Sequence, residues 1–396
     1  MKLRLAKRDR QALIEFLRDL IRIPSLSTHE GDLARRLRDE LLRVGVDDVR
    51  VDRIGNVIAR VGRGSGKKLL YNGHMDTVGV GDRSTWRRDP FEAQIVKGVI
   101  HGRGAADMKG ALAAMVYAAK LLVDSGAKLA GDLYVAGVVQ EEPCEGLAMR
   151  VLVEEEGIRP DWVVLGEATN LQLARGHRGR VEIRVTTQGK SCHAATPQLG
   201  DNAIYAAARV IVGIELLAAQ LGHDSFLGAG STAVTRIEST AGSNNAIPDS
   251  CTLYIDRRLT GGETEAKALA EVKRVVAREG IAARVEVSDY EATSYTGYAC
   301  QARQAFAYWV TPEDAPLLRQ AARTIEKVLG YAPSVGRWEF STDGTYSSGV
   351  AGIPTVGFGP GEERYVHTVD ERIRGTDVAA AAEVYAQLAV DLLGTE

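Results

Sequence analysis

The sequence predicts an α/β fold in which a mixed, mainly parallel sheet is interrupted by a smaller inserted domain. Three observations indicate this. Over residues 1–178, short apolar runs alternate with helical patterns. Between residues 179 and 291, the runs alternate apolar and polar residues, as in strands with one wet face. Residues 292–396 return to the first pattern, so we expect one domain from residues 1–178 and 292–396 and a second from residues 179–291.

The elements of the larger domain follow from the spacing of apolar residues. Leu, Ile and Phe recur at helical spacing in the first two segments, and an Ala- and Leu-rich segment ended by Gly126 has the composition of a buried helix. Apolar runs of about six residues are typical of buried strands. We expect helices at 8–23, 31–44, 108–126, 313–329 and 376–393, and strands at 56–61, 68–73, 132–139, 161–166 and 352–359.

The smaller domain has its own order of elements. Its strands alternate apolar and polar residues, and two helical patterns separate them. The resulting βαββαβ order is the ferredoxin-like arrangement. We expect strands at 180–187, 232–239, 251–258 and 283–288, with helices at 201–220 and 263–279.

Composition limits the function. The chain has 396 residues, 26% of them charged, and a net charge of -3, which predicts no nucleic-acid partner. No apolar run reaches the ~20 residues that span a bilayer, and the charged N-terminal segment has no signal-peptide core. The four cysteines lack a C-x-x-C pair, as is typical of reduced thiols. We therefore expect a cytoplasmic protein without a membrane partner.

Imidazole and carboxylate side chains follow the predicted strands. Open α/β sheets place their sites at the carboxyl ends of strands, so these groups should converge. A set of His and carboxylates without thiolates suits one or two divalent cations, Zn²⁺ first, with Mn²⁺ or Co²⁺ as alternatives. The candidates are His74, Asp76, Asp107, Glu141, Glu142, Glu167 and His367.

Each candidate has an ordinary alternative. A His at a strand end is more often hydrogen-bonded structure than a ligand, a Glu pair is usually solvated, and Asp107 could cap a helix. The joint occurrence of five candidate ligands at the ends of consecutive core elements, with Asp107 just before a helix, favours a metal site. Because residues i and i+2 of an extended segment point the same way, Asp76 should reach back to His74 and fix its tautomer.

Five segments carry a resemblance to a known family. "GHMDTV", "HGRGAADMKG", "QEEPCEG", "GEATN" and "YVHTVDE" stand in the order seen in the metallopeptidase family of acetylornithine deacetylase, succinyl-diaminopimelate desuccinylase, aminoacylase and the glutamate carboxypeptidases. The similarity covers nearly the whole chain and looks nearest to the selenium-metabolism-linked hydrolase branch. It implies a zinc-peptidase-like catalytic domain and a ferredoxin-like lid domain that also forms a dimer.

The resemblance implies two divalent ions per subunit. His74 and Glu167 would bind one ion, and Glu142 and His367 the other. Asp107 would bridge them, with a cis peptide bond to Met108. Glu141 would be the general base that takes a proton from a water bridging the two ions.

The resemblance also implies substrate contacts outside the metal ligands. His193 would polarise the substrate carbonyl in the partner subunit's active site, which requires a homodimer joined through the lid domains. Asn245 and Arg257 would contact a carboxylate or the oxyanion. A loop of small residues would cradle the carboxylate of the substrate through its backbone; this loop is Ser341, Thr342, Asp343 and Gly344.

The predicted function is therefore a metal-dependent amide hydrolase that deacylates N-acyl amino acids. A dipeptidase or carboxypeptidase acting on short peptides on the same scaffold is the alternative. A metal protein without catalysis would not need Glu141. A two-metal phosphoesterase would usually carry a phosphate-binding loop, and no G-x-x-x-x-G-K-[ST] occurs.

Overall fold

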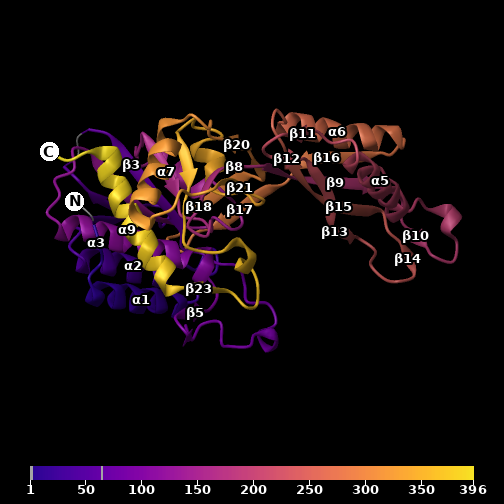
Figure 1. Ribbon diagram of the computed structural model, residues 1–396. Helices are drawn as coiled ribbons and strands as arrows, with labels where there is room; N and C mark the ends of the chain where they lie inside the picture. Colours follow the sequence, from indigo (N-terminus) through magenta and orange to yellow (C-terminus); the bar gives the residue numbers. More distant parts are fainter. Residues whose placement is uncertain (1–2, 64–65) are drawn as a thin grey trace.

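A computed structural model describes residues 3–63 and 66–396, so four residues of the expected larger domain (1, 2, 64 and 65) lie outside it. The chain forms a larger body, built from both of its ends, and a smaller body that extends away from it (Figure 1). Each body has an apolar core of its own. Among the helices of the described residues, none combines the length and the apolar character needed to cross a bilayer.

The larger body is built around a mixed sheet. Its four middle strands, β6, β3, β7 and β22, run parallel, and the strands outside them are mostly antiparallel. This confirms the expected mixed, mainly parallel sheet. The order is β1 (Asp48–Val51), β2 (Val57–Val61), β6 (Asp132–Val138), β3 (Lys68–His74), β7 (Trp162–Leu165), β22 (Thr355–Gly357), β8 (Leu173–His177) and β20 (Trp309–Val310), with β21 (Val335–Trp338) beside β8.

The helices of the larger body pack against the sheet and against one another through their apolar residues. On some helices these residues form a stripe along one face, and on others they surround the helix almost completely. Leu13, Phe16, Leu17 and Leu20 of α1 are buried at the spacing of one helical face. The Ala-rich α3 is apolar almost all round, and it is buried against α9. The helices are α1 (Lys7–Arg22), α2 (Gly31–Arg43), α3 (Gly110–Asp124), α4 (Leu147–Glu154), α7 (Pro316–Leu329), α8 (Gly344–Ser347) and α9 (Gly375–Leu393).

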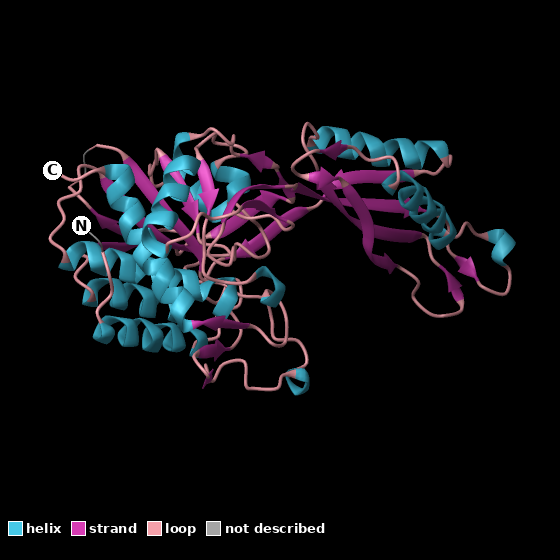
Figure 2. Cartoon of the chain, in the orientation of Figure 1, coloured by secondary structure: helices cyan, strands magenta, loops and turns pink. Residues whose placement is uncertain are grey.

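The smaller body has the predicted βαββαβ order. Its strands pair antiparallel in the order β13-β15-β9-β16, and two helices cover one face (Figure 2). Side chains of β9 and β15 alternate between that covered face and an open face. The elements are β9 (Gly179–Gln188), α5 (Ala203–Ala218), β13 (Ser231–Ser239), β15 (Ser250–Leu259), α6 (Glu265–Arg278) and β16 (Ala283–Val287).

A hairpin returns the chain to the larger body. It consists of β17 (Asp289–Thr293) and β18 (Ala299–Arg303), and several of its side chains pack against the larger core. The next strand, β19 (Ala305–Phe306), pairs with β9 of the smaller sheet. The expected domain boundary at residues 291 and 292 therefore falls inside this hairpin.

Short strand pairs complete the fold. They were not predicted because two or three residues carry no periodic signal. They are β4 (Ile95–Val96), β5 (Val99–His101) and β23 (Arg372–Arg374) in one sheet, β10 (Cys192–His193) with β14 (Ala246–Ile247), and β11 (His223–Asp224) with β12 (Gly228–Ala229).

Candidate metal centre

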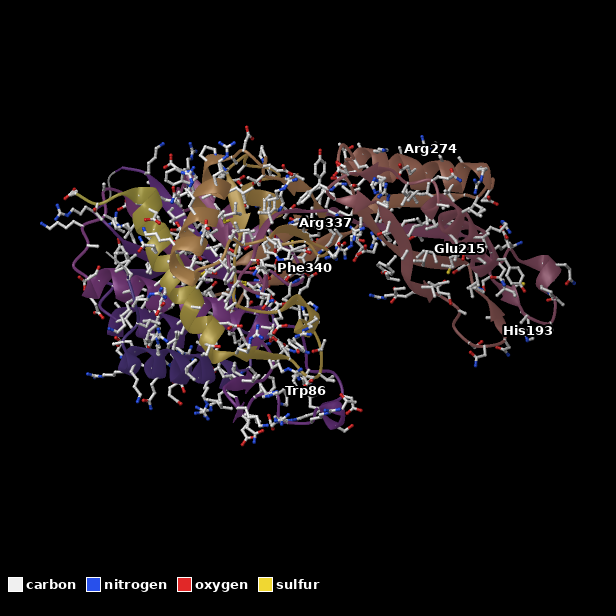
Figure 3. The ribbon with its side chains drawn as sticks, in the orientation of Figure 1. Trp86, His193, Glu215, Arg274, Arg337 and Phe340 are labelled. Carbon is white, nitrogen blue, oxygen red and sulfur yellow. The ribbon has the colours of Figure 1, made fainter. Side chains whose placement is uncertain are left out.

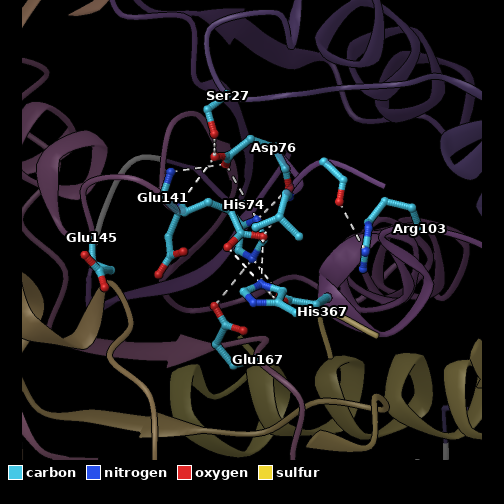
Figure 4. Close-up of polar contacts among 12 residues, drawn as sticks. Ser27, His74, Asp76, Arg103, Glu141, Glu145, Glu167 and His367 are labelled. Carbon is cyan, nitrogen blue, oxygen red and sulfur yellow. Dashed lines mark hydrogen bonds and ion pairs between the residues drawn. The ribbon is translucent and has the colours of Figure 1, made fainter. Parts of the chain in front are cut away.

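The candidate ligands converge at the carboxyl ends of the four parallel strands. His74 ends β3, Glu141 and Glu142 follow β6, and Glu167 follows β7. His367 lies on the loop after β22. Figure 4 shows the side chains of His74, Glu167 and His367 close together. The site therefore lies where open α/β sheets place their ligands.

Asp107 lies between the two histidines. Its Oδ1 is 2.8 Å from Nε2 of His74, and its Oδ2 is 3.2 Å from Nε2 of His367. The peptide bond between Asp107 and Met108 is cis, as the resemblance implied. Each oxygen of one buried carboxylate thus faces a different imidazole, which is the arrangement of a bridging ligand.

Each histidine also faces a second carboxylate. Nε2 of His74 is 3.7 Å from Oε1 of Glu167, and Nε2 of His367 is 3.0 Å from Oε2 of Glu142. Two overlapping groups could hold an ion, with donor atoms within 4.8 Å of one another. One group is His74, Asp107 and Glu142, and the other is His74, Glu141 and Glu167.

Burial and mutual charge set the ionisation of this cluster. Burial, followed by neighbouring carboxylates, raises the pKa of Glu141 and Glu167 well above the usual range. Burial opposes ionisation of Asp107 too, but hydrogen bonds from His367 and His74 outweigh it and hold its pKa below normal. Hydrogen bonds to Asp107 and Glu142 raise the pKa of His367 to about 10.

The donor set fits divalent cations. Four buried or nearly buried carboxylates surround two imidazoles, and thiolates are absent from both candidate groups in the described residues. Oε1 of Glu141 is buried and has no hydrogen-bond partner there. Nitrogen and oxygen ligands of this kind suit Zn²⁺, Co²⁺ or Mn²⁺.

Asp76 supports the site differently from the prediction. The nearest acceptor to Nδ1 of His74 is the backbone carbonyl of Asp76, at 2.9 Å, and the carboxylate oxygen is 3.6 Å away. The carboxylate accepts the amide N–H groups of Glu141 and Glu142 at 3.1 and 3.2 Å, and the Ser27 hydroxyl at 2.7 Å. The carbonyl therefore orients the imidazole, and the carboxylate positions the Glu pair.

Two supporting residues were missed by sequence reasoning. Glu371 is buried, accepts the amide N–H groups of Ala106 and Asp107 at 2.9 and 3.1 Å, and pairs with Arg103 at 2.6 Å. It therefore ties the segment after His367 to the backbone of Asp107. His177 accepts the Thr342 amide N–H at 3.0 Å, and burial lowers its pKa to about 4. The available signal for Glu371 was a Glu four residues after His367, whereas the strand that His177 ends was not predicted.

A cavity of about 420 Å³ opens beside the cluster. Five of the candidate site residues border it, and the wall opposite them brings together side chains from both bodies. Arg180 and Arg258 come from the smaller sheet, and Phe340 and Ser341 come from the larger body. The five candidates are Asp107, Glu141, Glu142, Glu167 and His367.

The predicted contact between Arg257 and the substrate is wrong, because the Arg257 side chain points away from the cavity. Side chains of β15 alternate, and Arg257 lies on its covered face, fully buried. It pairs there with Glu263 and Glu271 at 2.8 and 3.0 Å. Its neighbour Arg258 lies on the open face and borders the cavity. A shift of one residue along a strand reverses the face, so the choice between adjacent arginines depended on register.

The predicted loop of small residues forms part of the cavity wall. The Ser341 side chain borders the cavity and donates a hydrogen bond to Glu145. Thr342, Asp343 and Gly344 do not border it, because hydrogen bonds within the larger body hold them beneath the surface. Asp343 accepts the Gly146 amide N–H at 2.7 Å, and burial raises its pKa to about 6.

His193 and Asn245 lie side by side, away from the cluster. His193 pairs with Ala246 between β10 and β14, and the carbonyl of Asn245 accepts the Ala194 amide N–H at 2.8 Å. Figure 3 shows His193 at the far tip of the smaller body, whereas Phe340 lies beside the larger one. Within one chain, the structure does not bring them to the metal ligands.

Fold and site together define a metal-dependent hydrolase of amide or peptide bonds. The chain belongs to peptidase family M20/M25/M40, whose profile matches residues 70–391. It is 40% identical to the uncharacterized protein YgeY of Escherichia coli (strain K12), over 98% of this chain and 96% of that protein. It is 30% identical to succinyl-diaminopimelate desuccinylase of Magnetococcus marinus, over 95% and 97% of the two chains. The M20 family metallo-carboxypeptidase Sso-CP2 of Sulfolobus solfataricus shares the fold, with a TM-score of 0.75, 19% identity, and coverage of 97% and 99%.

Proposed function

We propose that the protein hydrolyses the amide bond of N-acyl amino acids with two divalent cations held by the cluster. The observation that carries this proposal is the placement of the two Asp107 oxygens against different histidines, each with its own further carboxylate. His74 and Glu167 would hold one cation, and Glu142 and His367 the other. Zn²⁺ is the first choice, and Co²⁺ or Mn²⁺ are the alternatives.

Paired cations, when bound, polarise a carbonyl and can lower the pKa of a water to about 7. The chain's own contribution would come from Glu141. Its backbone is fixed by Asp76, and its carboxylate borders the cavity without a hydrogen-bond partner on Oε1 among the described residues. It would accept the proton of the attacking water and return it to the leaving amine.

Arg258 is the group that we propose for the substrate carboxylate. Its guanidinium comes from the open face of the smaller sheet. Nε and Nη2 donate to the two carboxylate oxygens of Asp256 at 2.7 and 3.1 Å, which leaves Nη1 for a ligand. Ser341 borders the same cavity. An N-acyl amino acid would then place its amide at the cluster and its carboxylate toward the smaller domain.

The experiment that tests this function is a hydrolysis panel with Zn²⁺, Co²⁺ or Mn²⁺ added to metal-stripped protein. It compares N-acetyl, N-succinyl and N-formyl amino acids with dipeptides and with an N-acetyl amino acid amide that lacks the carboxylate. We expect turnover of at least one N-acyl acid, faster than that of the dipeptides and of the amide. Faster cleavage of dipeptides would favour the dipeptidase or carboxypeptidase alternative, and no hydrolysis with any metal would contradict both.

We also propose that residues 179–291 are a lid that joins two subunits. One face of α5 exposes apolar side chains, with Tyr205, Val212 and Leu216 being 69%, 55% and 55% exposed. The neighbouring β13 is an edge strand with Ile237 half exposed. Such a surface favours association with a second copy. In this dimer, His193 would reach the cavity of the partner.

Replacing Leu216 with Asp is expected to convert the dimer to a monomer, because it places a charge in the centre of the proposed interface. Sedimentation velocity measures the change, and Val350→Asp, at an exposed apolar residue of the larger body, is the matched control.

Mixing inactive His193→Ala and Glu141→Gln proteins should restore partial activity if His193 acts across subunits. A wild type that sediments as a monomer would contradict the dimer.

We also propose that the protein is cytoplasmic and that it lies near the selenium-metabolism-linked hydrolase branch of its family. The four cysteines are free, the state that a reducing cytoplasm maintains. "WEFSTDG" and "FGPGEERYVHTVDE" support placing the chain near the selenium-metabolism-linked hydrolase branch.

A further inference from the structure

The segment that carries Glu141 and Glu142 is contacted at both of its ends, by Tyr290 of β17 and by Gln304, which directly follows β18. Before the pair, the Tyr290 hydroxyl donates to Oε1 of Gln140 at 2.7 Å. After the pair, Nε2 of Gln304 donates to the carbonyl of Pro143 at 2.9 Å. Gln140 and Gln304 are buried, so these contacts do not exchange freely with water.

The backbone of this segment needs such support. Gln140 has a φ of 54°, a left-handed conformation that residues other than Gly rarely adopt. The surrounding structure must therefore over-determine it. Its amide N–H is held by Glu30 at 3.1 Å, and Asp76 holds the two amides that follow. The carboxylates of Glu30 and Asp76 fix one side of the segment, and the hairpin fixes the other.

The base of the hairpin is bonded to the smaller sheet. Ser288 donates its amide N–H to the carbonyl of Glu182 on β9 at 2.9 Å, and Gln304 donates its own to Ser288 at 2.8 Å. Glu182 in turn donates to the carbonyl of Gln304 at 2.9 Å. Any shift of β9 at this point therefore moves Gln304, which contacts the residue next to Glu142.

We propose that the β17–β18 hairpin couples the position of the smaller domain to the Glu141–Glu142 pair, with Tyr290 and Gln304 as positioning residues. The inference rests on the proposed function only for the role of Glu141. A shift of the smaller domain reaches Gln140 and Pro143 through these two side chains. The carboxylates are thereby aimed correctly only when the domains are correctly arranged around a substrate.

Kinetics of two single variants test the proposal. Tyr290→Phe removes the hydroxyl and keeps the ring, and Gln304→Met removes the donor and keeps the length of the side chain. We expect each to lower kcat by roughly 10-fold, part of the ~10²–10⁴-fold contribution of a positioned base, with KM within about twofold of the wild type. Tyr295→Phe is the matched control, because its hydroxyl on the same hairpin donates to the carbonyl of Gly55 at 2.8 Å, away from the Glu pair. The substrate is the panel compound that the wild type cleaves fastest.

Hydrogen–deuterium exchange gives a readout that does not depend on activity. Peptides covering residues 139–146 should exchange faster in Tyr290→Phe and Gln304→Met than in Tyr295→Phe, with equal metal content and similar melting temperatures. The proposal is overturned if the two variants match Tyr295→Phe in kcat, or if exchange rises while kcat stays unchanged. A wild type inactive on every panel compound would instead reject the proposed function.

Discussion

Replacing Glu141 with Gln is expected to lower kcat by roughly 10²–10⁴-fold while the protein keeps its bound metal. The amide has nearly the shape of the carboxylate but cannot accept a proton. Asp76 holds the backbone of Glu141 in either case, so the geometry should persist. Metal content by mass spectrometry and kcat on the best panel substrate measure the two effects.

This variant also decides between two roles that the geometry allows for Glu141. His74, Glu141 and Glu167 form one of the candidate ion-binding groups, so Glu141 could be a ligand instead of a base. Loss of one metal together with activity would assign it as a ligand. Full activity with full metal content would remove it from the reaction. Glu363→Gln, a carboxylate on the wall of the same cavity, is the matched control and should retain metal and most activity.

Replacing Asp107 with Asn is expected to abolish metal binding at one or both positions and to lower kcat by more than about 10³-fold. Among the residues that the structure describes, Asp107 is the side chain whose two oxygens face both histidines. An amide offers a single oxygen and directs an N–H group at the other position, so the shared ligand is lost.

Equilibrium dialysis against Zn²⁺, followed by metal analysis, measures this loss directly. Glu363→Gln again serves as the control for removal of a carboxylate at the cavity. An Asp107→Asn protein that binds the wild-type amount of metal would reject the bridging role, whatever its activity.

The fold was predicted where periodic patterns were long. The helices α1, α3 and α9 and the strands β3, β6, β9 and β15 lie within a few residues of the expected ranges. β8 was missed, because its Arg175 and Gly176 interrupt the apolar run although the strand is buried. Residues of β8 owe their burial to neighbours on other strands, which a local pattern does not contain.

The site was predicted as a set of residues but not in all of its contacts. The five proposed ligands and Glu141 lie close together, four of the ligands at or after the ends of strands and Asp107 just before α3, and their roles as ligands stay predictions. The role of the Asp76 carboxylate differed because it accepts hydrogen bonds from Ser27 and from the backbone of the Glu pair, which are distant in the sequence. Arg257 is in phase with the apolar residues of β15, so the alternation of that strand already places it on the covered face, and the prediction overlooked this.

The sequence by itself determined the order of strands and helices and the chemical types of side chain at the strand ends, because both depend on local spacing. Tertiary structure decided which oxygen of Asp107 faces which histidine, which of two adjacent arginines borders the cavity, and that Glu371 contacts the backbone of Asp107 and Tyr290 the side chain of Gln140. Those contacts join residues far apart in the chain. They are set by the registers in which the sheets pair and by the packing of the hairpin, and these depend on the whole fold.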